Sequence, residues 1–428
     1  MNAILIVNIK QLLMATKKNL SYIRGKKMDK IPIIENAYLY IEGNKIVDFG
    51  KMEDLQAKEA RIYSMVNEVI DANGRIVLPT YCDSHTHIAY VGDRVKEFVY
   101  KIKGLSYLDI SKKGGGILST VKLVRKASEE EIYQETRERI IEMIKLGTGA
   151  IEIKSGYGLD TENELKLLRV IKKLKNDLPI KIKATFLGAH AIPPEYKDNP
   201  NEYVNIIINE MLPQIANEDL ADFIDVFCEE SFFTEEQTET ILTAALKYGL
   251  KPKIHANQMS YSNAIKIAVN YNALSVDHIE YLAEDDIDIL KNSETMPTVL
   301  PGAAFYLNLP LTPVNKLIEN DVPIAAATDY NPGSSPSGNM NFILSLLCIK
   351  YKMLPSQAIA ATTINSAYAM NVEHILGTIS PGKLASFIIT KPVSSYECIP
   401  YYFGNHIIDK VFIEGKEVFN YSICNVNL

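Results

Sequence analysis

The 428-residue sequence lacks the features that mark several large classes of protein. Its five cysteines are widely spaced and include no Cys-x-x-Cys pair, which favours a reducing compartment over a disulfide framework. No apolar run reaches the roughly 18–20 residues that span a bilayer. The apolar start of the chain is short and no small-residue cleavage site follows it, so a signal peptide is not expected. We therefore expect a cytoplasmic protein without a membrane partner.

Basic clusters are absent as well. The formal net charge is −7, and no stripe of basic and aromatic residues stands out, so nucleic acid is not an expected partner. Apolar residues make up 47% of the chain and charged residues 23%, as in an ordinary globular protein with a sizeable core. The length exceeds one typical domain and suits a large α/β barrel with an accessory domain.

The two ends of the chain differ from its middle. Both ends alternate short apolar runs with turn residues, whereas the middle alternates apolar runs with helical segments, a pattern typical of βα units. Eight such runs can be counted: Val77–His87, Ala150–Ser155, Ile180–His190, Phe223–Glu229, Pro252–Gln258, Leu274–Glu280, Thr295–Gly302 and Pro323–Asp329. We predict an α/β fold, a (β/α)8 TIM-like barrel over residues 79–376. Residues 1–78 and 377–428 are expected to form a small β-sandwich domain.

Capping patterns indicate where several helices begin and end. Ser128 and Thr234 each precede a glutamate or glutamine by three positions, which is the capping-box spacing, and Thr161 opens another helix. Gly147 and Gly249 lie where two of these helices should end.

Histidine is scarce, and its distribution is informative. Five of the seven histidines lie at the ends of predicted strands, and an aspartate ends the eighth run. These residues are His85, His87, His190, His255, His278 and Asp329. Side chains at the C-terminal ends of barrel strands converge on one face, where the active sites of this fold lie.

This set has the composition of a metal site. His85 and His87 are two residues apart on a strand, so they point to the same side. With His255 and Asp329 they would bind one divalent ion such as Zn²⁺ or Fe²⁺ and leave a position for water, whose pKa the ion lowers to about 7. A neighbouring carboxylate can accept the proton of that water. Alternatively, a single His-x-His pair can be structural, and Asp329 alone could cap a helix.

Two motifs carry a family resemblance. Leu78–His87, which reads Leu-Pro-Thr-Tyr-Cys-Asp-Ser-His-Thr-His, resembles the first metal motif of the amidohydrolase superfamily. Gly377–Ala385 resembles the segment by which that family's chain returns to its small β domain, although Ser386 replaces the acidic residue that usually follows. Two-metal members commonly end the fourth strand with lysine, and Phe223–Glu229 has none there, so the resemblance implies a single metal ion.

Within the superfamily, further segments resemble the imidazolonepropionase family, and the resemblance spans about residues 37–390. These segments are His87–Arg94, Gly114–Val121, Lys154–Leu159, Leu187–Tyr196 and Asp329–Ser335. The resemblance implies a small-molecule substrate with a carboxylate. The reaction would be hydrolysis of the cyclic C–N bond of 4-imidazolone-5-propanoate to N-formimidoyl-L-glutamate by a metal-bound hydroxide, in histidine degradation. A homodimer is also implied.

The resemblance assigns roles to particular residues. The metal ligands would be His85, His87, His255 and Asp329. The catalytic residues would be Asp329, His278 and Gln258. The substrate would contact Arg94, Tyr157, His190, Gln258, His278, Asn331, Gly333 and Ser334. A guanidinium suits a carboxylate because it offers two parallel donors, but a salt bridge to Asp93 or Glu97 is the alternative for Arg94.

Two questions stay open at this point. Gly114–Gly116 is either a mobile lid or a flexible connector. Gln258 stands where family deaminases carry glutamate, and an amide cannot titrate, which argues against a deaminase of cyclic amidines. A non-catalytic family member is the other rival. Release of ammonia and metal content would distinguish these readings.

Overall fold

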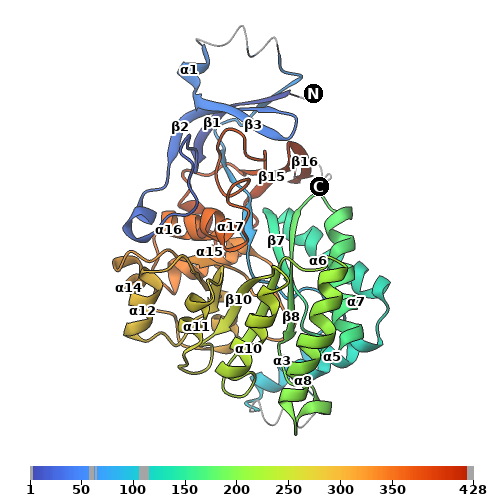
Figure 1. The fold of residues 1–428 in the computed structure, drawn as a ribbon. Helices are drawn as coiled ribbons and strands as arrows, with labels where there is room; N and C mark the ends of the chain where they lie inside the picture. The colour runs from blue at the N-terminus through green and yellow to red at the C-terminus, as the bar shows by residue number, and fades with distance from the viewer. Residues whose placement is uncertain (1–2, 57–61, 63–64, 106–114, 422–428) are drawn as a thin grey trace.

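The computed structural model describes residues 3–56, 62, 65–105 and 115–421, which form two sheets with helices around the second (Figure 1). The first sheet combines strands from both ends of the chain. The second is a barrel of parallel strands formed by the middle of the chain. In Figure 1 the blue N-terminal strands lie at the top beside the red strands β15 and β16, and the barrel lies below them.

The barrel has eight strands, in chain order, each paired in parallel with the next. They are β6 (Tyr81–Asp83), β7 (Thr148–Lys154), β8 (Lys181–Ala189), β9 (Phe223–Cys228), β10 (Lys251–Ala256), β11 (Ser275–His278), β12 (Met296–Val299) and β13 (Ala325–Ala326). The predicted (β/α)8 barrel is therefore confirmed. It closes just beyond β6 and β13, where the Asp329 N–H donates to the His85 carbonyl (3.1 Å) and the His87 N–H donates to the Tyr330 carbonyl (2.9 Å).

Helices connect the barrel strands and cover the outside of the barrel. Those before β10 are α3 (Val95–Ile102), α5 (Ile117–Lys126), α6 (Glu129–Lys145), α7 (Thr161–Asp177), α8 (Pro200–Ile206), a π-helical turn (Ile207–Met211), α9 (Leu212–Asn217) and α10 (Glu235–Leu246). Those after β10 are α11 (Ala264–Asn270), α12 (Glu284–Lys291), α13 (Pro301–Leu307), α14 (Val314–Glu319), α15 (Met340–Ile349), α16 (Pro355–Ala360), a second π-helical turn (Ala361–Asn365) and α17 (Ser366–Ala369).

The sequence signals at the helix ends are present in the structure. Ser128 and Thr234 each accept a hydrogen bond from the backbone three residues later, and both capping boxes are complete. Gly147 and Gly249 follow the ends of α6 and α10 with φ of +97° and +77°, a left-handed conformation that glycine adopts without strain. The helix expected at Thr161 begins there, with Asp160 as its cap.

The other sheet joins the two ends of the chain. Its strands are β1 (Ala3–Leu13), β2 (Ile33–Glu42), β3 (Lys45–Lys51), β4 (Glu68–Asp71), β5 (Ile76–Pro79), β14 (Phe387–Thr390), β15 (Ile408–Ile413) and β16 (Lys416–Asn420). The order is β16-β15-β14-β5-β1-β2-β3, and β4 pairs with β1. Short helices α1 (Met52–Gln56) and α18 (Cys398–Tyr401) and two 3₁₀ turns (Gly25–Asp29, Pro194–Tyr196) complete the described elements.

This terminal sheet has its own apolar core. Leu12 and Leu39 from the N-terminal strands share one buried cluster with Phe387 and Phe412 from the C-terminal strands. The rings of Phe387 and Phe412 stack with centroids 4.6 Å apart. The predicted β domain built from both ends is therefore confirmed, whereas its boundaries at residues 78 and 377 stay a prediction.

One predicted strand is wrong, because the run forms two strands that belong to different sheets. The run Val77–His87 is divided, because β5 pairs with β14 in the terminal sheet and β6 begins the barrel at Tyr81. Between them the Thr80 N–H donates to the Ser386 carbonyl (3.2 Å) and the Tyr81 N–H to the Gly147 carbonyl (3.0 Å). Both strands are buried, so an unbroken apolar run does not reveal where the chain passes from one sheet to the other.

Among the described residues, no helix is both long enough and apolar enough to cross a membrane. Four cysteines lie in the described part of the chain, and all four are free thiols. Cys424 lies outside the described residues.

Candidate metal centre

The predicted histidines and aspartate lie together at the C-terminal end of the barrel. His85 and His87 follow β6, and Asp329 follows β13 beside them. His255 belongs to β10 and His278 ends β11, while His190 directly follows β8. Five of the six residues are buried and His190 is half-buried. The barrel thus brings together residues that are up to 244 positions apart in the sequence.

Four of these side chains have the spacing of metal ligands. His87 Nε2 lies 3.2 Å from His85 Nε2 and 3.3 Å from His255 Nε2. Asp329 Oδ1 lies 3.6 Å from His85 Nε2 and 3.5 Å from His87 Nε2. Ligand atoms held tetrahedrally at ~2.0–2.2 Å from one ion are about 3.3–3.6 Å apart. Four of the six distances among these donor atoms therefore fit one divalent metal ion, and His85, His87 and Asp329 form a mutually close group.

Two aspartates orient the histidines toward that point. His85 Nδ1 donates to Asp277 Oδ2 at 2.7 Å, since a carboxylate can only accept. His255 Nδ1 lies 3.0 Å from Asp225 Oδ2. Such contacts leave the Nε2 lone pair facing the centre, as a metal ligand requires. Burial is the largest cause that lowers the pKa of both histidines, which favours the neutral imidazole.

These two aspartates belong to a group of fully buried charged side chains, here called the buried charge network: Glu152, Lys154, Asp225, Lys253 and Asp277. Lys154 Nζ lies 2.5 Å from Glu152 Oε1, 2.7 Å from Asp225 Oδ2 and 3.8 Å from Asp277 Oδ2. Lys253 pairs with Glu152 and donates to the Ser84 carbonyl at 3.0 Å. Burial disfavours the charged form of Lys154, but the three carboxylates outweigh it and raise the pKa of this ammonium.

The sequence analysis missed this network. The available signal was a pair of charged residues two positions apart inside an apolar run, Glu152 with Lys154 on β7, because such residues point to the same side of a strand. Lys253 and His255 repeat the spacing on β10. Charged residues that alternate with apolar ones along β7 and β10 therefore marked the support of the site.

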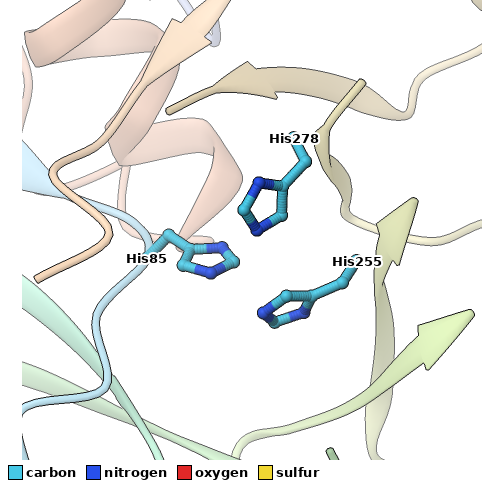
Figure 2. Close-up of side chains that lie close together, drawn as sticks. All are labelled: His85, His255 and His278. Atoms are coloured by element: carbon cyan, nitrogen blue, oxygen red, sulfur yellow. The ribbon is translucent and has the colours of Figure 1, made fainter. Parts of the chain in front are cut away.

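His278 belongs to the same cluster but has different surroundings. Figure 2 shows the imidazoles of His85, His255 and His278 around a shared space, and their ligand atoms lie within 4.8 Å of one another. His278 Nδ1 lies 3.6 Å from Glu280 Oε1. Although burial opposes it, the Glu280 carboxylate raises the pKa of His278 and favours the protonated ring, which cannot be a ligand. His278 is thus better suited to donate a proton or a hydrogen bond.

His190 and Tyr157 form one wall of the cluster. His190 stacks on His87 with ring centroids 4.9 Å apart, and its Nδ1 donates to the Gly156 carbonyl at 3.0 Å. In the neutral ring this contact leaves His190 Nε2 without a proton, so this nitrogen can accept a hydrogen bond from a ligand. A Cβ on Gly156, whose φ is +103°, would lie 2.8 Å from His190 Nδ1. Tyr157 is buried, with its ring centroid 5.5 Å from that of His190.

Arg94 and the loop Asn331–Ser334, which follows Asp329, form a further part of the site, here called the rim. A Cβ on Gly333 would lie 2.1 Å from Arg94 Nη1, so this backbone packs directly on the guanidinium. The Asn331 amide nitrogen donates to the Asp329 carbonyl and to Ser334 Oγ, both at 2.7 Å, and its oxygen accepts from the Gly333 and Ser334 N–H groups, both at 2.8 Å. The Asn331 side chain therefore shapes the loop. The backbone N–H of Asn331 donates to the Ser335 carbonyl at 3.0 Å, so its predicted substrate contact would have to come from its own carbonyl.

Two predicted features of the site, Gln258 and the glycine segment Gly114–Gly116, are not placed in the histidine cluster. Gln258 is half-buried and is held through its backbone N–H, which donates to Glu229 Oε2 at 3.0 Å. No contact of its side chain with the histidines is found among residues 3–56, 62, 65–105 and 115–421, so its catalytic role stays a prediction. For the predicted lid or connector Gly114–Gly116, Gly114 lies outside the described residues.

Several residues at the site have a strained backbone conformation. Asn257, His278, Ile279 and Asp329 all have positive φ, at 54°, 81°, 57° and 51°. A β-branched residue such as Ile279 rarely adopts this conformation, and each such residue costs about 1–3 kcal/mol. Strain of this kind persists where the surrounding structure holds a side chain in a required direction, as here at the ends of three barrel strands.

Comparison with known proteins supports the fold and shows the family. The model of the Amidohydrolase family matches residues 76–418. The imidazolonepropionase of Flavobacterium psychrophilum is 52% identical over 412 residues, covering 96% of this chain and 99% of that protein. The imidazolonepropionase of Christiangramia forsetii is 50% identical over 413 residues, with the same two coverages. Among solved structures, guanine deaminase of E. coli matches with a TM-score of 0.73 at 15% identity, covering 98% of this chain and 99% of that one.

These likenesses define the class first. The barrel, the cluster of side chains that could hold a metal ion and the family match are those of a metal-dependent amidohydrolase, a hydrolase that acts on carbon–nitrogen bonds. Within that class, the chain belongs to the imidazolonepropionase family, since relatives about half identical to it match over nearly its whole length. The likeness to guanine deaminase, at 15% identity, concerns the fold alone.

Proposed function

We propose that this chain hydrolyses the cyclic C–N bond of 4-imidazolone-5-propanoate and releases N-formimidoyl-L-glutamate, a step of histidine degradation. The observation that carries the reaction class is the convergence of three imidazoles and one carboxylate, in which His87 Nε2 lies 3.2–3.5 Å from a donor atom of each of the other three residues. The substrate follows from the imidazolonepropionases that match 96% of the chain. The small-molecule substrate would enter from the C-terminal face of the barrel.

We propose His85, His87, His255 and Asp329 as ligands of one Zn²⁺ or Fe²⁺ ion, because imidazole and carboxylate groups suit both metals. When bound, the ion polarises the ring carbonyl and lowers the pKa of a coordinated water to about 7. Elemental analysis of protein purified without added metal distinguishes zinc from iron. His278 stays outside this ligand set, because Glu280 favours its protonated form.

Asp329 is proposed to move the proton. Its Oδ1 faces the histidine nitrogens, while Ser334 Oγ lies 3.4 Å from its Oδ2. The carboxylate would take a proton from the attacking water and return it to the ring nitrogen as the C–N bond breaks. The water oxygen ends in the new carboxylate, and the ring nitrogen ends in the formimidoyl group. Burial raises the pKa of Asp329 to about 7, a shift that a bound cation would oppose.

The other side chains are proposed to bind and polarise the substrate. Arg94 would hold the propanoate carboxylate, and the backbone of Asn331 and Gly333 with Ser334 would hold polar atoms near it. His278 would donate to the oxygen that gains negative charge in the transition state. Tyr157 and His190 would contact the ring, His190 through its unprotonated Nε2. For Gln258 we propose only substrate orientation, because an amide has no proton to transfer at neutral pH.

A deaminase of cyclic amidines is the weaker candidate. Gln258 stands where that reaction would need an acid, and the half-identical relatives are all imidazolonepropionases. Detection of ammonia from a pterin, purine or cytosine would favour it. We also propose that the protein is a cytoplasmic homodimer; light scattering after size exclusion tests the assembly.

The function is tested by a coupled assay. Because imidazolonepropanoate is unstable, urocanase generates it in place, and its ultraviolet absorbance and the formimidoyl-glutamate product are followed together. Wild-type protein should consume the intermediate, and Asp329→Ala should lower kcat by on the order of 10⁴-fold, since it removes a ligand and the proton acceptor. Asp285→Ala, on the exposed first turn of α12, is the matched control and should keep full activity.

Near-full activity of Asp329→Ala would remove Asp329 from the mechanism. A metal-loaded wild-type protein that leaves the intermediate untouched would instead sink the proposed substrate. A protein that binds no metal would favour the non-catalytic reading.

A further inference from the structure

Arg94, the proposed carboxylate ligand, is not free in the structure. Its Nε donates to Glu97 Oε2 at 2.9 Å, and its Nη2 donates to the same oxygen at 2.6 Å. Glu97 is 7% exposed, so this pair differs from an ordinary surface salt bridge. Both residues begin α3, three positions apart, which places them on the same side of the helix.

The other oxygen of Glu97 is anchored to a different element. Glu97 Oε1 accepts from the Gly116 N–H at 3.0 Å and lies 3.0 Å from Ser119 Oγ. Gly116 is the N-cap of α5, a position that supplies no side-chain cap of its own. A carboxylate is favoured there because the first N–H groups of a helix lack partners within it. The Glu97 carboxylate is therefore fixed from one side by α5 and holds the guanidinium from the other.

These contacts leave one edge of Arg94 available. Glu97 occupies Nε and one proton of Nη2, so the edge formed by Nη1 and Nη2 keeps a parallel pair of donors. Gly333 packs against Nη1 closely enough that a Cβ there would clash. The guanidinium is thus set between Glu97 and the rim backbone in one orientation.

The local charge still suits an anion. Lys101, about one turn beyond Glu97 on α3, donates to the Gly333 carbonyl at 2.9 Å. Two cations and one carboxylate therefore leave one net positive charge beside the rim. A substrate carboxylate would meet an oriented donor edge in a site that remains cationic.

We propose that Glu97 is a positioning residue. It orients the donor edge of Arg94 toward the substrate carboxylate, and its contact with Gly116 anchors this orientation to the start of α5. This inference rests on the proposed function, because it takes Arg94 as the ligand of the propanoate group. The opposing view is that Glu97 competes with the substrate for Arg94, and it makes the opposite prediction for the KM of a Glu97 variant.

The first experiment is Glu97→Gln in the metal-loaded enzyme. Gln keeps the shape and can still accept from Gly116, but it loses the charge that holds Arg94. We expect KM to rise about tenfold while kcat changes less than about twofold. Ser119→Ala, which loosens the far end of the contact, should raise KM about two- to threefold.

The matched control is Glu135→Gln. Glu135 Oε2 likewise accepts from an arginine, Arg139 Nη2 at 2.6 Å, and from a glycine N–H, Gly92 at 3.1 Å, but Arg139 lies over the Tyr90 ring instead of beside the rim. Its KM should stay at the wild-type value. Glu97→Gln should also add nothing further to KM in an Arg94→Gln background, because the two residues would act as one unit.

A binding measurement separates this inference from the reaction itself. 3-(Imidazol-4-yl)propanoate should bind the wild-type protein, and Glu97→Gln should weaken it about tenfold in calorimetry. The corresponding amide should bind both proteins equally. An unchanged or lower KM for Glu97→Gln, an effect equal to that of Glu135→Gln, or no binding of the propanoate by the wild-type protein overturns the inference. Failure of turnover with intact, Glu97-dependent binding of the propanoate overturns only the proposed reaction.

Discussion

The buried charge network and the rim both place an ammonium or guanidinium group beside carboxylates, yet their surroundings differ. All five side chains of the network are fully buried, and its carboxylates contact the proposed metal ligands His85 and His255. At the rim, Arg94 is half-buried and keeps a free donor edge. The charges of the network have no access to water and must be balanced by other groups of the protein. The rim instead keeps a positive charge that a substrate carboxylate can pair with.

The comparison implies a division of labour. Changes in the network should alter folding and metal affinity before they alter recognition of the substrate. Changes at the rim should alter KM and leave metal binding intact. Each variant below tests one side of that division.

The largest effect is expected from Lys154→Met. It leaves the Glu152, Asp225 and Asp277 carboxylates buried with only Lys253 to balance them, and breaking a buried ion pair costs about 3–5 kcal/mol. The free energy of unfolding in urea measures this loss. Lys173→Met is the control, because its partner Glu130, 3.0 Å away, and Lys173 itself are both more than half exposed; a much smaller loss is expected, since water screens this pair. An equal loss of unfolding free energy in Lys154→Met and Lys173→Met would show that the buried network contributes no more than an exposed ion pair.

A smaller effect is expected from Asp277→Asn, which removes the charge that orients His85. Loss of such a partner behind a metal-binding histidine lowers metal affinity by about 10- to 100-fold. Competition with a chelator of known affinity measures it. Asp222→Asn is the control: it accepts from Lys183 Nζ (2.8 Å) and the Ala184 N–H (3.0 Å) at the opposite end of the barrel. Unchanged affinity in Asp277→Asn would mean that the imidazole is held by packing alone.

The same contrast explains what the sequence could reveal. Eight apolar runs alternating with helical segments predicted the barrel. The five histidines and Asp329 at the ends of these runs predicted the cluster, because strand ends of this fold converge whatever the lengths of the connecting segments. The partners behind them were not visible: pairing Lys154 with Asp225 requires the register of β7 against β9, two barrel positions away. The positive φ of His278 and Asp329 is likewise imposed by the barrel, and no local residue preference announces it. The passage from β5 to β6 was missed because both strands are equally apolar.

The smallest effect is expected from Gly333→Ala at the rim. The added methyl group would meet Arg94 Nη1 at 2.1 Å, so the guanidinium must turn from its position beside Glu97. The φ of Gly333 is not in the left-handed region, and alanine therefore brings a steric change without backbone strain. We expect KM to rise about fivefold, equivalent to about 1 kcal/mol, with metal affinity unchanged.

The outcome separates the two regions because the change touches only one of them. Gly50→Ala, in β3 of the terminal sheet, is the control and should leave KM unaltered, since its nearest contact would be the Tyr38 side chain at 3.2 Å. A Gly333→Ala protein that loses metal before it loses substrate affinity would show that the rim and the ligands are mechanically coupled. The contact most suited to carry such coupling is Ser334 Oγ at 3.4 Å from Asp329 Oδ2. A rise in KM without a loss of metal affinity would show that this position of the loop acts on substrate binding through the orientation of Arg94, and not on the metal centre.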